Sequence, residues 1–205
     1  ASSGWRLDDD GDRRVAELAR RVRFGVRADR EGVSLRDYHT IGGSHSGRET
    51  PWTGLLTAEG KIKRTTANTP PHTEVSERSY LCDACFLVML EADEATLTQI
   101  EGALRSPFWP PFLGRKACVP GEPVWLCDGL QPDALLDALK DYPWLGSDPR
   151  KYPERVRLVV EDADGPEVRP DQPLSFAERQ FAPRRVRTSF IPAPPIKEAP
   201  CTSLD

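Results

Sequence analysis

Long apolar runs are absent from this sequence. No stretch approaches the roughly 20 apolar residues that a membrane-spanning helix needs. The opening segment, ASSGWRLDDDGD, lacks the basic flank and apolar run of a secretory signal peptide. Five cysteines leave one unpaired in any disulfide scheme, which argues against a small disulfide-framed secreted scaffold. We therefore expect a reducing, cytoplasmic location and no membrane partner.

Motifs of the common enzyme classes are also missing. The sequence contains no G-x-S-x-G, P-loop, H-E-x-x-H or G-x-G-x-x-G pattern. Cys82 and Cys85 form a C-x-x-C, but the pattern places them at the start of one strand, where residues three apart point to opposite faces. Two thiolates that point apart cannot share one metal ion, so core cysteines are expected. The sequence thus indicates no cofactor and no metal site.

A strong charge of either sign is lacking as well. The net charge of -4 excludes an indiscriminate polybasic nucleic-acid binder, although a local basic face is compatible with it. A hydrophobic content of 38% allows a core, but a lean one, and the 20 prolines and 15 glycines indicate long loops. Most of the 28 basic residues are arginines, whose planar fork suits paired contacts to phosphates and base edges.

The periodicity of apolar residues indicates a mixture of helices and strands. Helices are predicted over 13–21, over 93–106 with Asp93 as cap and Pro107 as stop, and over 132–142 with Pro132 in the first turn. Strands are predicted on both sides of the turn 29–32, and over 86–90, 123–127 and 155–162. The continuous apolar run 86–90 is typical of a central strand buried on both faces. The pattern indicates an α+β fold with a partly antiparallel sheet.

Residues 41–77 and 191–205 differ in composition from the rest. The first stretch is rich in Gly, Thr, Ser and Pro, and it contains Lys61, Lys63 and Arg64. A long irregular stretch inside a compact domain is usually functional or disordered, so a binding insertion and a flexible surface insertion both stay open. The proline-rich residues 191–205 are expected to form a disordered tail.

The loop 108–123, FWPPFLGRKACVPGEP, is the clearest candidate binding element. Its four prolines exclude a helix or a central strand and predict a rigid, exposed connection. Gly114 lets the backbone approach a ligand closely, and Arg115 and Lys116 would contact phosphates.

Two further pairs of residues suit RNA. Arg78 and Tyr80, before the apolar strand, add a cation and a stacking surface. His39 follows Tyr38, and a histidine beside a tyrosine can act as acid and base in RNA cleavage. A hydrogen-bonded histidine at a strand end is the other interpretation.

Several blocks of the sequence, spread over about residues 22–187, carry a family resemblance. They are RFGVRADREG, LRDYHT, ERSYLCDACFLVML, ALRSPFWPPFLGRKACVPGEPVW and DQPLSFAERQFAPRRV. These blocks resemble the CasD family (Cas-five family, RAMP superfamily), whose members bind the crRNA 5′ handle in the type I-E CRISPR complex Cascade. The family begins with an apolar strand and a glycine-rich helix that this sequence does not show. We therefore expect that the first strand and helix are missing from this chain.

The resemblance implies a ferredoxin-like (RRM-like) RAMP fold with a long protruding thumb. Residues 1–40 would then be a partial N-terminal segment, 41–77 the thumb and 78–190 the remainder of the RAMP domain. It implies a non-catalytic RNA-binding subunit that holds the 5′ handle and caps the backbone filament in antiviral defence. The RNA-binding residues would be Tyr38, His39, Lys61, Lys63, Arg64, Arg78, Tyr80, Gly114, Arg115 and Lys116.

The implied partners are the crRNA, the backbone subunit through the thumb, and the large PAM-reading subunit, with target DNA met only within the complex. An alternative function is a metal-independent endoribonuclease that processes CRISPR repeat RNA with Tyr38 and His39. A protein-interaction module without RNA contact is a third interpretation.

Overall fold

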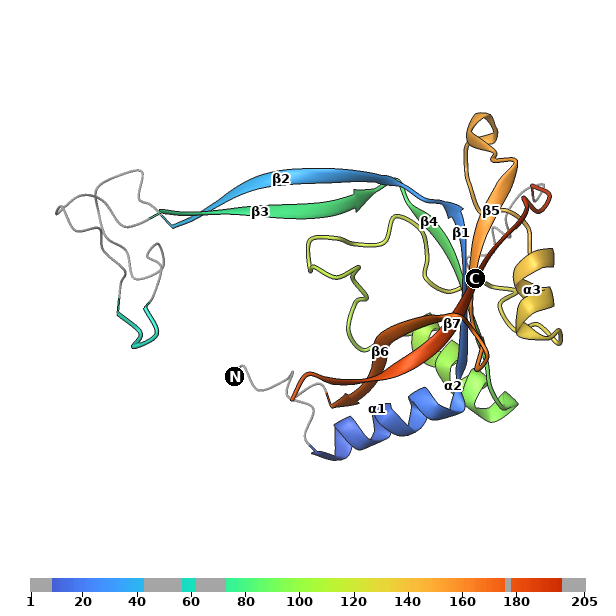
Figure 1. The fold of residues 1–205 in the computed structure, drawn as a ribbon, viewed down its shortest axis with the longest axis horizontal. Coiled ribbons are helices and arrows are strands. Elements are labelled where there is room, and N and C mark those ends of the chain that lie inside the picture. The colour runs from blue at the N-terminus through green and yellow to red at the C-terminus, as the bar shows by residue number, and fades with distance from the viewer. Residues whose placement is uncertain (1–8, 43–56, 62–72, 176–177, 197–205) are drawn as a thin grey trace. The chain divides into compact units, whose positions relative to one another are not determined.

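A computed structural model describes residues 9–42, 57–61, 73–175 and 178–196 (Figure 1). The chain divides into two compact units, of which one is Gly32–Ala84 and the other combines Ala1–Glu31 with Cys85–Asp205. Among the described residues, no helix has both the length and the apolar character needed to cross a membrane.

The larger unit is built on a five-stranded antiparallel sheet in the order β4-β1-β5-β7-β6. Its elements are α1 (Asp9–Arg21), β1 (Arg23–Arg30), β4 (Cys85–Glu91), α2 (Glu94–Arg105), α3 (Leu135–Asp141), the short 3-10 helix Pro149–Lys151, β5 (Arg155–Glu161), β6 (Glu167–Ser175) and β7 (Gln180–Pro192). The mixture of helices with an antiparallel sheet confirms the predicted fold class at this level.

The core of this unit lies where α3 packs on β1 and β4. Its buried members come from the sheet and from α3, and they are Leu87, Leu135, Leu139, Tyr142, Leu158 and Val160. Gly25 lets the helix approach the sheet, because a Cβ atom there would lie 2.5 Å from Leu139 Cδ1. Most of the buried apolar side chains thus lie on one face of the sheet.

A fully buried ion pair lies beside this core. Arg27 and Asp29 are two residues apart on β1 and therefore share a face, and their side chains are 0% exposed. The guanidinium binds both carboxylate oxygens, at 2.6 and 2.9 Å. It also donates to the carbonyls of Leu139, Tyr142 and Pro143. This network holds the carbonyl end of α3 on the sheet.

Asp29 also accepts hydrogen bonds from the segment that follows α3. Asp29 Oδ2 accepts the backbone N–H of Leu145 at 2.8 Å, and the Asp29 carbonyl accepts the indole N–H of Trp144 at 3.0 Å. A buried charge is tolerated only when it is paired and hydrogen-bonded, and both charges here meet that condition.

The run 86–90 is a strand, as predicted, but its burial was predicted wrongly. Among the described strands, β4 pairs only with β1 and is an edge strand. Leu87 faces the core and is 1% exposed, whereas Phe86 and Val88 are 40% and 50% exposed. Alternate side chains of a strand point to opposite faces, so a continuous apolar run does not by itself require two buried faces.

Between α2 and β5, the predicted strand is wrong, whereas the predicted helix over 132–142 is confirmed as α3 except for its start. Residues 123–127 form no strand; there Trp125 lies 5.1 Å from the Arg105 guanidinium and donates to the Glu101 carboxylate at 3.3 Å. α3 begins at Leu135, with Ala134 as its cap, so Pro132 precedes the helix. Local pattern alone could not reveal that this tryptophan packs on the preceding helix.

The C-terminal strands β6 and β7 were not predicted, because Pro170, Pro173 and Pro183 interrupt the strand pattern. Proline cannot donate to a ladder and is confined largely to edges and bulges. The register shifts near Pro170 and Pro173 on the edge strand β6 agree with that rule.

The predicted disorder of 191–205 is wrong for its described part. Tyr152 Oη donates to the Ala193 carbonyl at 2.8 Å, and the Trp144 N–H donates to the Pro195 carbonyl at 3.0 Å. A proline-rich segment keeps all its carbonyl acceptors, so side chains and backbone groups of the domain can hold it in place. Residues 197–205 lie outside the described part.

In the smaller unit, the described residues include a long two-stranded hairpin. β2 (Val33–Gly42) pairs antiparallel with β3 (Thr73–Cys82), from Val33 opposite Cys82 to Gly42 opposite Thr73 (Figure 1). Residues 57–61 form a turn in which the Thr57 N–H donates to the Lys61 carbonyl at 2.7 Å. The predicted insertion 41–77 lies within this unit, and its residues 43–56 and 62–72 are outside the described part.

Asp93 caps α2 as predicted. Its carboxylate accepts the N–H of Thr96 at 2.9 Å and the Thr96 hydroxyl at 2.7 Å, and it pairs with Arg21 at 2.8 Å. The Thr96 hydroxyl, followed by the Arg21 guanidinium, holds the pKa of Asp93 well below its usual value.

We expect this cap to make stability depend on pH in acid. Because the folded-state pKa is depressed, the charged cap stabilises fully above the unfolded-state pKa of about 3.9, and the stabilisation is lost as the pH falls below it. Asp93→Asn should lower the melting temperature slightly at pH 7, with a difference from wild type that narrows toward pH 2. Thermal unfolding across this range measures it. Asp133→Asn, which changes an exposed carboxylate, is the control. If the difference in melting temperature between Asp93→Asn and wild type stayed constant from pH 7 to pH 2, the pH-dependent role of Asp93 would be contradicted.

Candidate nucleic-acid interface

The residues 113–118 form a closed turn that presents two cations. The Leu113 N–H donates to the Cys118 carbonyl, and the Cys118 N–H donates to the Arg115 carbonyl, both at 2.8 Å. Arg115 and Lys116 are exposed between these bonds. The predicted exposed connection without helix or strand is therefore confirmed at this turn.

Gly114 is required by the backbone conformation of the turn and not by crowding. Its φ is +78°, and a Cβ atom built there would meet nothing within 4 Å. Only glycine adopts this left-handed conformation without steric cost. The open space beside it leaves the backbone accessible to a ligand, as expected.

The turn lies in a stretch of chain that has no acidic residue. Residues 102–121 contain Arg105, Arg115 and Lys116 but no aspartate or glutamate, in a chain whose net charge is -4. Lys116 forms no ion pair with any of the residues that the structure describes. This stretch of the chain is therefore locally basic, which the overall net charge conceals.

The arginines of the basic segment 184–187 each bind an acceptor within the same unit. Arg184 makes two hydrogen bonds to the Asp171 carboxylate, at 2.9 and 2.7 Å, and lowers its pKa. Arg187 pairs with Asp162 at 2.6 Å, and Arg185 donates to the Gly165 carbonyl at 2.9 Å. These contacts tie the arginines to the β6–β7 region and to the turn before β6.

The hairpin brings three of the predicted residues to one face. In its register His39 lies opposite Ser76, and Arg78 and Tyr80 follow on alternate positions of β3. Residues two apart on a strand share a face and lie about 7 Å apart. A cation and an aromatic ring thus stand side by side on a regular strand.

Tyr38 faces the opposite side of the hairpin. It is 69% exposed and lies opposite Glu77 in the register, whereas the neighbouring His39 belongs to the other face. The His39 carbonyl accepts the Ser76 hydroxyl at 3.4 Å. Because successive side chains alternate, Tyr38 and His39 do not converge on one reacting group.

The remaining predicted residues are distributed differently. Lys61 is exposed and closes the turn 57–61. Lys63 and Arg64 lie outside the described residues. Six of the ten candidates thus form two groups: Gly114, Arg115 and Lys116 in the larger unit, and His39, Arg78 and Tyr80 in the hairpin.

The C-x-x-C cysteines do not lie on one strand, contrary to expectation. Cys82 ends β3 and Cys85 begins β4, with Asp83 between them at a φ of +56°. Both are half-buried and not core residues. Burial, and then the Asp29 carboxylate, raise the pKa of the Cys85 thiol, which disfavours the thiolate that a metal or an electrophile would need.

Two aromatic residues near the turn were missed by the sequence analysis. Phe108 is 88% exposed and Trp109 is 56% exposed, and both lie in the same acid-free stretch. The absence of carboxylates from 102–121 was the signal that could have drawn attention to the whole segment.

Comparisons with known proteins agree with the resemblance seen in the sequence. The family model described as CRISPR-associated protein (Cas_Cas5) matches residues 1–187. The CRISPR system Cascade subunit CasD of Escherichia coli (strain K12) is 31% identical over 200 residues, which cover 90% of this chain and 76% of that protein.

Two solved structures have a similar fold. One, described as the crystal structure of a Cas protein, is 31% identical with a TM-score of 0.61, covering 89% of this chain and 80% of its own. The other, from a CRISPR RNA-guided surveillance complex, is 29% identical with a TM-score of 0.63, covering 90% and 77%.

Proposed function

Because this chain belongs to the Cas5 family of CRISPR-associated proteins, we propose that it is a non-catalytic RNA-binding subunit of a type I-E CRISPR interference complex. In this role it holds the 5′ handle of the crRNA and caps the backbone filament in antiviral defence. The similarity to a Cascade subunit and to a chain of a surveillance complex supports the assignment.

The observation that carries the proposal is the turn 113–118. It presents Arg115 and Lys116 to solvent on a backbone held by two hydrogen bonds, in a stretch without carboxylates. Because the backbone of the turn is already held before binding, the entropy cost of contacting phosphates falls on the two side chains. The open backbone at Gly114 leaves room for the RNA strand to pass closely.

The fold suits an assembly subunit. We propose that the sheet of the larger unit belongs to a ferredoxin-like RAMP domain, since β1 and β4 are antiparallel neighbours and α2 follows β4. The hairpin β2–β3 is proposed as the base of a thumb that contacts the backbone subunit. The large PAM-reading subunit is a further proposed partner, and target DNA is met only within the complex.

The absence of catalysis is part of the proposal and rests on the hairpin. Tyr38 and His39 are on opposite faces, and His39 is the single histidine among the described residues. A general acid and base that cleave RNA must both reach the scissile phosphate. This geometry does not favour the alternative endoribonuclease.

One experiment tests binding and catalysis together. Labelled crRNA repeat is mixed with the protein in EDTA, with and without the other Cascade subunits, and RNA retention and length are measured. Intact RNA retained with the partners is the expected result. Cleavage by the protein alone that His39→Ala abolishes would establish the endoribonuclease instead.

We expect the double variant Arg115→Ala/Lys116→Ala to bind the crRNA handle at least about tenfold more weakly, since charge-assisted bonds contribute about 1.5–3 kcal/mol each. The slope of log K against log salt should become shallower by about 1.4, which corresponds to two lost phosphate contacts on single-stranded RNA. Titrations at several salt concentrations measure both quantities. Arg150→Ala, whose guanidinium is engaged by Asp148, is the matched control. An unchanged slope would exclude the turn from the RNA site.

A further inference from the structure

We propose that Phe108, supported by Trp109, is a stacking platform for one unpaired base of the bound RNA. This inference rests on the proposed RNA-binding function and adds a base contact to the phosphate contacts of Arg115 and Lys116. RNA-binding proteins commonly stack splayed bases on exposed aromatic side chains.

The two rings are arranged as a rigid corner. Their centroids are 5.0 Å apart and their planes meet at 89°, which is a favourable edge-to-face contact. Phe108 is nevertheless 88% exposed, so its ring faces remain largely open. An apolar ring held this far into water by its neighbour has a surface that a base can cover.

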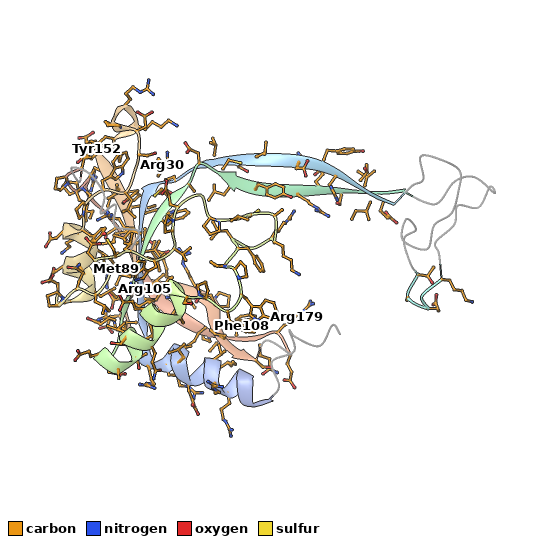
Figure 2. The ribbon with its side chains drawn as sticks, turned by 180° about the vertical axis from the view of Figure 1, so that it is seen from behind. Arg30, Met89, Arg105, Phe108, Tyr152 and Arg179 are labelled. Atoms are coloured by element: carbon orange, nitrogen blue, oxygen red, sulfur yellow. The ribbon has the colours of Figure 1, made fainter. Side chains whose placement is uncertain are left out.

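The backbone around the pair restricts its motion. Pro107 precedes Phe108, and Pro110 and Pro111 follow Trp109. Each proline fixes its own φ and confines the preceding residue to extended conformations. Of the two ring-bearing residues, Trp109 is confined in this way by Pro110, so less backbone entropy is lost when a base stacks on the pair. In Figure 2, Phe108 lies on the loop that leaves α2, beyond Arg105.

The charges around the pair favour RNA over a protein as the occupant. Arg105 lies three residues before Phe108, and Arg115 and Lys116 follow, without an acidic residue from 102 to 121. Arg105 stacks over Trp125 at 5.1 Å, which keeps this cation beside the start of the loop. Three cations in a stretch without carboxylates attract the phosphates that flank a stacked base.

The test combines Phe108→Ala with a scan of abasic sites. Single-stranded RNA of the repeat-derived 5′ handle is prepared with one base removed at a time, and each RNA is titrated with the wild-type protein and the variant. We expect one abasic position to weaken wild-type binding about fivefold or more, as the loss of one stacked base does. Phe108→Ala should lose a similar factor on intact RNA and be insensitive to that position.

Control variants separate stacking from structure. Phe108→Tyr retains a stacking ring and should bind like wild type, and Phe190→Ala removes a ring of 55% exposure elsewhere and should have no effect. The salt slope should not change in Phe108→Ala, in contrast to Arg115→Ala/Lys116→Ala, because no phosphate contact is lost.

Three results would overturn the inference. If Phe108→Ala binds every RNA like wild type while Arg115→Ala/Lys116→Ala binds RNA more weakly, the stacking proposal is wrong and the proposed function stands. If Phe108→Ala binds RNA normally but no longer joins the other Cascade subunits, the platform is a protein contact. If wild type binds no handle RNA, with or without its partners, the proposed function fails and the stacking fails with it.

Discussion

Replacing Arg27 by methionine should lower the free energy of unfolding by about 3–5 kcal/mol, which is the usual cost of breaking a buried ion pair by removing one partner. Methionine has a similar length, so the change removes the charge and leaves most of the volume. It leaves the Asp29 carboxylate buried beside the Leu145 N–H without its guanidinium partner, and it removes one donor each from the Leu139, Tyr142 and Pro143 carbonyls.

The matched control for this substitution is Arg157→Met. Arg157 also makes two short hydrogen bonds to a carboxylate, at 2.7 and 2.6 Å to Glu31. Its side chain is 32% exposed and that of Glu31 is 55% exposed, so water screens the pair. Pairs of this kind contribute about 0–1 kcal/mol. Denaturant unfolding of both variants measures their free energies of unfolding. Equal losses would show that burial does not make the Arg27–Asp29 pair more important for stability than the exposed pair.

The second large effect concerns Leu139, which is fully buried in the contact between α3 and the sheet. Leu139→Ala should destabilise the protein by about 2–5 kcal/mol, because it loses buried apolar surface and leaves a cavity. The control on the same helix is Leu136→Ala. Leu136 is 42% exposed, so its truncation should cost much less. Thermal and denaturant unfolding of the two variants provide the comparison.

A double mutant makes the Leu139 prediction sharper. Gly25→Ala alone should destabilise by about 1–3 kcal/mol, because the new methyl would lie 2.5 Å from Leu139 Cδ1. In the Leu139→Ala background the same methyl enters the cavity. We therefore expect the double variant to be more stable than the sum of the single effects predicts. Strict additivity would show that Gly25 and Leu139 are not packed as described.

The sequence by itself determined those features that depend on local chemistry. The helix 94–105 was predictable because Asp93 is a good cap and Pro107 cannot continue a helix. The strand 155–161 was predictable from its β-branched residues. The exposed turn with Arg115 and Lys116 was predictable because prolines and glycine exclude regular structure there. The family was also recognisable from motifs that the comparisons bear out.

Only the tertiary structure decided the features that depend on distant partners. From sequence alone, an arginine in a strand is expected to face solvent. Arg27 can be buried only because Asp29 and the carbonyls at the end of α3 and after it accept its hydrogen bonds. The proline-rich strands β6 and β7 form because a ladder at the sheet edge tolerates missing donors. The 88% exposure of Phe108 likewise became known only from the structure, in which its ring contacts Trp109 after the end of α2. Local patterns record propensities, whereas burial and pairing depend on which distant groups the fold brings together.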